Sequence, residues 1–311
     1  MDTYTKKTKE WLDNRFKSTD ENGVYKSHAS IYGFSKDFLS LGMYKNNYTI
    51  LREIEKISSE YTIHDFLEVG CAEGYTTHLI KEIFGFEVTV CDLSFEAVKR
   101  AKEIYNFRGF AADVQALRNI KNDSFDLVLC SETIEHVPNP KEAFEELIRV
   151  AKKVLLITVP AAKNKKEKET YIPPKGPHTH LNIFTKAEMI KFTGGGKVRG
   201  ISLNWLNKIE SFFANNKNIF SGKSKIVKGI YKTIRFLFLP VRKCYGVNIA
   251  KIFIRLDYLL CRIAQSRVFT YMVTLKKAFP EFENKSIKYK NILDYMLKES
   301  KVEPYFLDGK M

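Results

Sequence analysis

Short apolar runs alternate with amphipathic helical patterns between residues 61 and 160, and this alternation restricts the fold more than any other feature of the 311-residue chain. Buried strands separated by helices favour a parallel sheet with helices on both faces. We therefore predict an α/β protein with a doubly wound sheet of seven strands. Strands are expected at 64–69, 87–91, 109–112, 125–130, 154–159, near 198–203 and near 268–275, and helices at 75–83, 94–104 and 140–150.

The turn after the first predicted strand has the composition of a ligand site. The stretch FLEVGCAEGY places Glu68, Gly70 and Gly74 where a strand passes into a helix. Glycine lets the backbone turn tightly and lets a ligand approach, and the start of the helix offers free N–H groups. Because Ala72 takes the middle small position, the pattern departs from the GxGxxG of dinucleotide sites, and a pyrophosphate fits poorly. We expect a nucleotide-sized ligand here.

Two acids follow the next two predicted strands. Asp92 closes the second strand, where a carboxylate can accept hydrogen bonds from both ribose hydroxyls of an adenosine. Asp113 closes the third, where it can accept from the adenine amino group. Both are expected at the carboxyl edge of the sheet. Helix caps for the acids and ordinary turns for the glycines are the structural alternatives.

The chain resembles the class I S-adenosylmethionine-dependent methyltransferases in the successive motifs FLEVGCAEGY, VTVCDLS, AADV, FDLVLCSETIEHVPNP and VLLITVP, and more loosely in HLNIFTKAEM. The resemblance covers residues 61–160 and implies a Rossmann-like fold with S-adenosylmethionine as cofactor. It places the methionine moiety at the glycine turn, the ribose at Asp92, the adenine at Asp113, and the methyl donor and acceptor near Ser131. The family tolerates Ala72 in place of glycine. The residues implied to bind the cofactor are Glu68, Gly70, Ala72, Gly74, Asp92, Leu93, Asp113, Val114, Ser131 and Glu132.

Three histidines are candidates for the catalytic base. Methyl transfer to a hydroxyl requires the loss of a proton, and histidine titrates near neutrality. His136 follows the fourth predicted strand, and His178 and His180 follow the fifth, so both loops should open at the same end of the sheet. Packing against the cofactor is the alternative for His136.

A metal is the other interpretation of this motif. If ETIEH forms a helical turn, Glu132, Glu135 and His136 share one face, and a later histidine would complete a metal site. This pattern is similar to that of RNA 3′-terminal 2′-O-methyltransferases, which hold a divalent metal. A Glu–His pair before VPNP is also widespread in metal-free methyltransferases of this fold, so we predict no resident metal.

The charge of the chain is concentrated in one segment. Residues 197–277 carry 17 Lys and Arg against two acids, and so account for the whole formal net charge of +15. We expect a basic helical insertion at 204–267, between the last two strands. One helix would place Lys225, Lys228, Lys232 and Arg235 on a single face, and a second would span NIAKIFIRLDYLLCRIA. Such helices suit an anionic membrane surface; a helical lid over the active site is the alternative, and nucleic acid ranks third.

These patterns divide the chain into four parts and favour one function. We expect a helical cap at 1–60, the cofactor-binding core at 61–203, the basic insertion at 204–267, and the last strand with a tail at 268–311. The five scattered cysteines indicate reduced thiols, and the charged N-terminus lacks a signal-peptide pattern, so we expect a cytoplasmic protein, peripheral to the inner face of the membrane.

The predicted function is O-methylation of a saccharide, lipid-linked or other small-molecule acceptor. An RNA 3′-terminal 2′-O-methyltransferase and a cofactor-binding protein without turnover remain the alternatives. The sequence does not indicate an oligomeric state.

Overall fold

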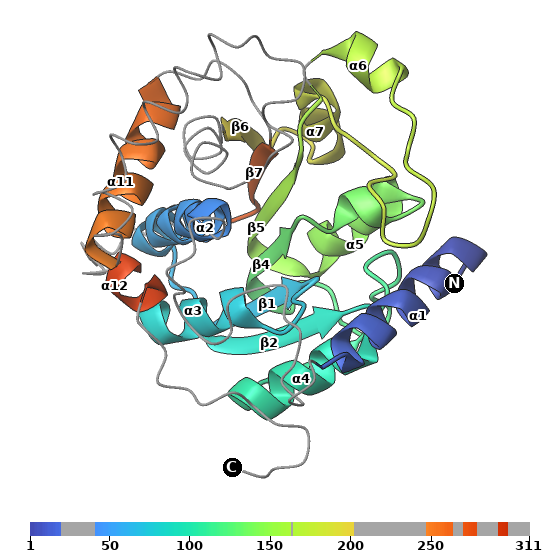
Figure 1. Ribbon diagram of the computed structural model, residues 1–311, viewed down its shortest axis with the longest axis horizontal. Helices are drawn as coiled ribbons and strands as arrows, with labels where there is room; N and C mark the ends of the chain where they lie inside the picture. Colours follow the sequence, from blue (N-terminus) through green and yellow to red (C-terminus); the bar gives the residue numbers. More distant parts are fainter. Residues whose placement is uncertain (20–40, 163, 202–246, 264–269, 279–291, 298–311) are drawn as a thin grey trace, which may run out of the picture.

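A seven-stranded sheet forms the centre of the protein in the computed structural model, which describes residues 1–19, 41–162, 164–201, 247–263, 270–278 and 292–297 (Figure 1). The strand order is β3-β2-β1-β4-β5-β7-β6, with the first five strands parallel and β7 antiparallel to both of its neighbours. The predicted doubly wound seven-stranded sheet is thereby confirmed. The strands are β1 (Asp65–Val69), β2 (Glu87–Asp92), β3 (Arg108–Ala111), β4 (Phe125–Ser131), β5 (Ala151–Pro160), β6 (Lys197–Ile201) and β7 (Thr270–Lys276).

The strand order reverses direction between β1 and β4. These two strands and β5 are buried along nearly their whole length, as their apolar sequences require for strands covered on both faces. The edge strands β3 and β6 are shorter and less buried. In an open α/β sheet, ligands bind beside the carboxyl ends of the strands where the order reverses, so the site is expected at the ends of β1, β2 and β4.

The connecting helices begin and end at residues whose chemistry suits those positions. Ser94 accepts a hydrogen bond from the N–H of Ala97 at the start of α4 (Phe95–Tyr105). Asn139 caps α5 (Pro140–Val150), whose first residue is a proline. Helix α3 (Tyr75–Phe84) ends at Gly85 in the left-handed conformation.

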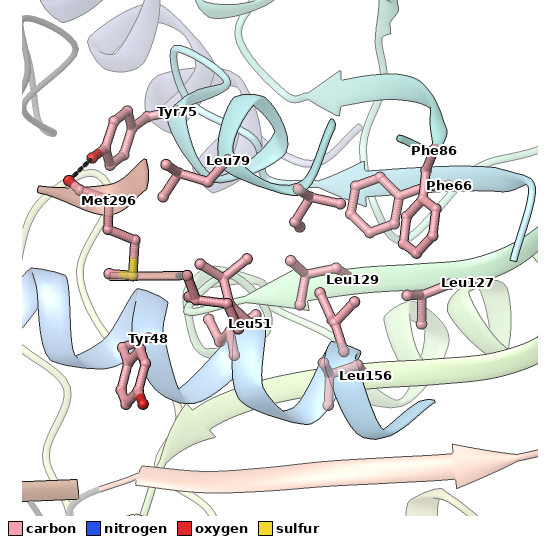
Figure 2. Close-up of a cluster of buried hydrophobic side chains, with 14 of the residues drawn as sticks. Tyr48, Leu51, Phe66, Tyr75, Leu79, Phe86, Leu127, Leu129, Leu156 and Met296 are labelled. Carbon is pink, nitrogen blue, oxygen red and sulfur yellow. Dashed lines mark hydrogen bonds between the residues drawn. The ribbon is translucent and has the colours of Figure 1, made fainter. Parts of the chain in front are cut away.

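Helices cover both faces of the sheet. On one face, α2 (Leu41–Glu60), α3, α11 (Val247–Ile263) and α12 (Ile292–Met296) pack over a large apolar cluster (Figures 1 and 2). Figure 2 shows Leu129 of β4 and Leu156 of β5 facing Leu51 of α2, and the Tyr75 hydroxyl donating to the Met296 carbonyl. The other face is covered by α5 and α7 (Lys186–Phe192). The short α6 (Lys165–Glu169) and the 3₁₀ turn η2 (Ile134–His136) complete the described elements.

The described residues of the expected N-terminal cap include two helices with different surroundings. Helix α1 (Thr3–Lys17) packs on α4 near the carboxyl edge of the sheet, whereas α2 is part of the main core (Figure 1). The proposed division into four parts stays a prediction.

Of the expected basic insertion at 204–267, the structure describes only α11. It packs on α2, and a buried ion pair joins Lys45 of α2 to Asp257 of α11 at 2.5 Å. The predicted basic face of Lys225, Lys228, Lys232 and Arg235 lies outside the described residues. Among the described helices, none has the length and apolarity needed to cross a bilayer.

Candidate active site

A cavity opens at the carboxyl edge of the sheet, beside the reversal in strand order. Its volume is about 270 Å³, just below the ~300–1,000 Å³ typical of ligand pockets. It is lined by Tyr4, Thr5, Thr8, Leu12, Phe16, Val69, Gly70, Ala72, Asp92, Leu93, Ala112, Asp113, Val114, Ser131, Glu132, Thr133, His136, Val137 and His178.

The turn after β1 has no room for larger residues. Gly70 has φ +80°, and a Cβ there would lie 2.0 Å from Thr133 Oγ1. Gly74 also has φ +80° and would meet Ala101 at 3.1 Å, but it does not line the cavity. Both glycines are therefore required by the backbone conformation and by close packing, and Gly70 also faces the cavity.

Glu68 lies beneath this turn rather than in the cavity. Its carboxylate accepts hydrogen bonds from the Thr77 hydroxyl and, at 3.1 Å, from the Thr77 N–H at the start of α3. Burial raises the pKa of Glu68 to about 8. Within the described structure, Glu68 thus supports the turn from behind.

Asp92 connects the turn after β1 to the end of β2. One carboxylate oxygen accepts from the Ala72 N–H and the other from the Ser94 N–H, both at 2.9 Å. Each oxygen has a second lone pair, so the carboxylate can accept from two further hydroxyls in the cavity, which it lines next to Leu93. Burial raises the pKa of Asp92 to about 6.

The loops after β3 and β4 form two further walls. The Asp113 carboxylate accepts from the N–H of Gln115 at 2.9 Å, and the buried Val114 beside it lines the cavity. The Ser131 hydroxyl lies 2.8 Å from the hydroxyl of Thr158.

Backbone strain is concentrated at this cavity. Five described non-glycine residues have positive φ, and three of them, Ala72, Glu132 and His178, line the cavity. Strained backbone persists where the surrounding structure enforces it, as at ligand sites.

The His136 ring has a defined tautomer. Its Nδ1 lies 3.0 Å from the backbone carbonyl of Thr179, and because a carbonyl only accepts, Nδ1 carries the proton. The other nitrogen, Nε2, is therefore unprotonated in the neutral ring. Burial, together with the neighbouring His178, lowers the pKa of His136 to about 3, so the ring is neutral at physiological pH.

Glu135 is an unusual neighbour for this histidine. Its side chain is fully buried, and neither carboxylate oxygen has a hydrogen-bond partner among the described residues. Oε1 lies 3.8 Å from His136 Nε2 and 4.0 Å from His180 Nε2. Burial and the Glu132 carboxylate raise the pKa of Glu135 well above its ordinary value. The three side chains can bring one ligand atom each within 4.8 Å of one another.

The three candidate histidines therefore converge, although only two of them line the cavity. The His178 ring stacks on His136 with a centroid distance of 4.0 Å, and His180 meets His136 edge-on at 4.8 Å. His180 is half exposed and does not line the cavity.

The contribution of α1 to this site was not predicted from the sequence. Five of its residues line the cavity, and they fall on one face of the helix. Leu12 and Phe16 pack near Ala72 and Leu93, on the side of Asp92. The spacing of Thr8, Leu12 and Phe16 was the only available signal, because it indicates an amphipathic helix but not the surface that the helix covers.

Residues 67–156 match the family model described as a methyltransferase domain. This match spans β1 to β5 and includes every strand end that lines the cavity. Residues 67–156 therefore form a methyltransferase domain of the class I, S-adenosylmethionine-dependent type.

Two curated relatives illustrate the range of acceptors among similar proteins. The methyltransferase is 26% identical over 174 residues to the ubiquinone biosynthesis O-methyltransferase of Idiomarina loihiensis, an alignment that covers 49% of this chain and 70% of the relative. It is 36% identical over 93 residues to norajmaline N-methyltransferase of Rauvolfia serpentina, covering 28% and 32% of the two chains. A solved structure, a putative sarcosine dimethylglycine methyltransferase from Galdieria sulphuraria, is 12% identical with a TM-score of 0.47, covering 75% of this chain and 85% of that one.

The cofactor of this methyltransferase is S-adenosylmethionine, and the cavity has features that fit it. Gly70 lines the cavity at the turn after β1, and the spare acceptor capacity of the buried Asp92 suits a pair of hydroxyls. Small and apolar residues at 72, 93 and 114 line the walls between these polar groups.

Proposed function

We propose that this methyltransferase transfers the methyl group to a hydroxyl oxygen of a saccharide, lipid-linked or other small-molecule acceptor. The single observation that carries the proposal is the hydrogen bond from His136 Nδ1–H to Thr179 O, because it directs an unprotonated Nε2 away from the backbone. The O-methyltransferase among the relatives supports oxygen as the acceptor atom. A hydroxyl acceptor must lose a proton, so the base beside it must be unprotonated.

The cofactor would be held at the ends of the parallel strands. Gly70, Ala72 and the turn that ends at Gly74 would enclose the methionine moiety, with Glu68 stiffening the turn from behind. Asp92, next to Leu93, would accept from the ribose hydroxyls. The remaining cofactor contacts would come from Asp113, Val114, Ser131 and Glu132.

When bound, S-adenosylmethionine supplies an electrophilic methyl group. The chain aligns the acceptor hydroxyl with that group and accepts its proton at His136 Nε2. Glu135 Oε1 lies 3.8 Å from Nε2, next to the atom that would receive the proton. His178, which stacks on His136 and lines the cavity, would contact the acceptor or serve as the base if His136 does not. His180 meets the His136 ring edge-on and would be the next candidate for the base.

The acceptor class is inferred from the charged segment and from α11. Three apolar residues of α11, Ile252, Leu256 and Leu259, are 49–55% exposed, and the exposed Arg255 lies among them. Their spacing places them on one face of the helix. An apolar stripe with cations in a segment of net charge +15 complements an anionic lipid surface. We infer that the enzyme works at such a surface on the inner face of the membrane, where lipid-linked acceptors are found.

An acceptor screen with methyl-labelled S-adenosylmethionine tests this proposal. Purified protein is incubated with fractionated cell extract, and the labelled product is isolated and its methyl linkage determined. A methyl ether on a saccharide or lipid-linked product supports the proposal. A methylated nitrogen or carbon, or cofactor binding without any labelled product, contradicts it.

The Glu135 cluster favours one second candidate, an RNA 3′-terminal 2′-O-methyltransferase. A fully buried carboxylate with two unpartnered oxygens beside two imidazoles has the donor set of a divalent metal site, so these residues fit a metal. Glu135, His136 and His180 would hold the ion, with Glu132 nearby. When bound, such an ion polarises a ribose hydroxyl.

Metal content and thermal stability decide between the two candidates. Under the metal hypothesis, the purified protein carries a stoichiometric divalent ion, and a chelator lowers its Tm, whereas Glu135→Gln abolishes both effects. Glu145→Gln, at an exposed glutamate of α5, is the matched control. A protein that remains metal-free, with a Tm insensitive to chelator and added ions, leaves the first proposal as the account of the site.

A further inference from the structure

Three side chains of α1 contact the same two residues of the loop that carries the later histidines. Tyr4, Thr8 and Trp11 are spaced i, i+4 and i+7, and so lie on one face of the helix. The Thr179 N–H donates to the Tyr4 hydroxyl at 3.1 Å, and the His178 N–H donates to Thr8 Oγ1 at 3.3 Å. The Trp11 ring stacks on the His178 ring, with centroids 5.3 Å apart and planes 14° apart.

His178 and Thr179, the two residues that α1 contacts, also contact His136. The His178 ring stacks on His136 at 4.0 Å with the planes again 14° apart, so the three rings form one continuous stack. The Thr179 carbonyl accepts from His136 Nδ1. His178 has a left-handed backbone with φ 49°, a conformation that costs free energy for a residue with a side chain and therefore needs support from its surroundings.

The rest of α1 is fixed to the cofactor side of the site. Asp13 accepts a hydrogen bond from the Ser94 hydroxyl at 2.6 Å, at the end of β2. The buried Arg100 of α4 donates to the Phe16 carbonyl and pairs with Glu73 of the turn after β1 at 3.4 Å. Because α1 is anchored at this end, its first turns have a defined position against the loop.

We propose that α1 positions the catalytic base, with Tyr4, Thr8 and Trp11 holding His178 and Thr179 so that His136 keeps its tautomer and ring orientation. The inference rests on the proposed function only in taking His136 as the base. Trp11 does not line the cavity, so it acts through His178 as a positioning residue. Tyr4 and Thr8 line the cavity and can touch the acceptor as well.

Trp11 is therefore the residue to vary. Trp11→Ala removes the outer ring of the stack, and we expect kcat with the identified acceptor to fall by about tenfold or more, since displacement of a catalytic group by ~1 Å can cost ~100-fold. The KM for the acceptor and the affinity for S-adenosylhomocysteine should change by less than about threefold. Trp11→Phe retains a stacking ring and should restore most of the rate. Glu10→Ala, at the exposed neighbouring position, is the control for truncation of α1.

A second measurement reports on the His136 ring without turnover. In ¹⁵N-labelled protein at neutral pH, His136 should show a protonated Nδ1 and an unprotonated Nε2 in the wild type and in Trp11→Phe. Trp11→Ala should shift these resonances toward a mixture of tautomers, whereas Glu10→Ala should not. Thermal unfolding of each variant verifies that it is folded.

The results separate this inference from the proposed function. If His136→Ala retains full turnover, the base assignment fails, and a changed His136 spectrum in Trp11→Ala still supports the positioning role of α1. If His136→Ala is inactive but Trp11→Ala keeps both the wild-type kcat and the wild-type His136 spectrum, the positioning role is wrong. A loss of cofactor affinity in Trp11→Ala equal to its loss of rate would also overturn it.

Discussion

Asp92 shows how one buried carboxylate can organise a site and also bind a ligand. Its two oxygens tie the turn after β1 to the start of α4 through the N–H groups of Ala72 and Ser94. Those hydrogen bonds favour the ionised form, but burial outweighs them and raises the pKa to about 6. The proposed ribose contact would therefore titrate close to physiological pH.

We predict that cofactor affinity falls as the pH falls through about 6. Above pH 6 the Asp92 carboxylate is charged and accepts strongly from hydroxyls; below pH 6 it is increasingly protonated and loses charged acceptor capacity. Between pH 7.5 and pH 5 the Kd for S-adenosylhomocysteine should rise by about tenfold, one pKa unit being ~1.4 kcal/mol. Calorimetric titration across this range provides the measurement.

Two variants control for other titrating groups. Asp92→Asn should bind more weakly at pH 7.5 and should lose most of the pH dependence. Asp65→Asn, at the opposite end of β1 on the surface, should behave as the wild type. A wild-type affinity that stays flat down to pH 5 would remove Asp92 from the ribose contact.

At the scale of elements, the strands and the core helices were predictable because their signals are local. The seven strand positions agree with the alternation of apolar runs, and α5 begins and ends where its proline and apolar spacing indicate. The fold followed, because short parallel strands joined by helices have few alternative arrangements.

The acceptor side of the site was predictable only in part. The motifs pointed to His136 and His178. The stacking of Trp11 on His178, however, joins positions 167 residues apart, and no local sequence pattern encodes this contact. The isolation of the Glu135 carboxylate likewise depends on which groups surround it in space. Glu68 occurs in the motif, yet its side chain faces Thr77 rather than the cavity.

Helix α11 leads to a prediction about membranes. Changing Ile252, Leu256 and Leu259 together to Gln should reduce co-sedimentation with anionic vesicles by about tenfold or more, because the exposed apolar stripe can no longer enter the headgroup region. Cofactor affinity should be unchanged, since α11 does not line the cavity.

The control replaces apolar residues that are exposed elsewhere, Ile172 and Ile190, with Gln. This variant should sediment with vesicles as the wild type does. Two results would exclude α11 as a membrane-binding surface. Either the wild type and the α11 variant bind anionic vesicles equally well, or the wild type does not bind them.

At the scale of the whole molecule, the site is assembled from segments that are far apart in the chain. The ends of β1, β2 and β4 supply the cofactor wall, residues 178–180 supply imidazoles, and α1 lies across both sides of the cavity. The sheet fixes the first group, and α1 joins it to the second through Asp13 and Trp11. Rate and cofactor affinity should therefore respond to different parts of the protein.

The single-turnover rate of His136→Ala with the identified acceptor is the most direct test of this account. We predict a rate about a hundredfold or more below that of the wild type, with the affinity for S-adenosylhomocysteine within about twofold of the wild-type value, because the lost imidazole accepts the proton but does not hold the cofactor. A wild-type rate in a folded His136→Ala protein would contradict the account, and would indicate an acceptor that reacts without histidine as the base.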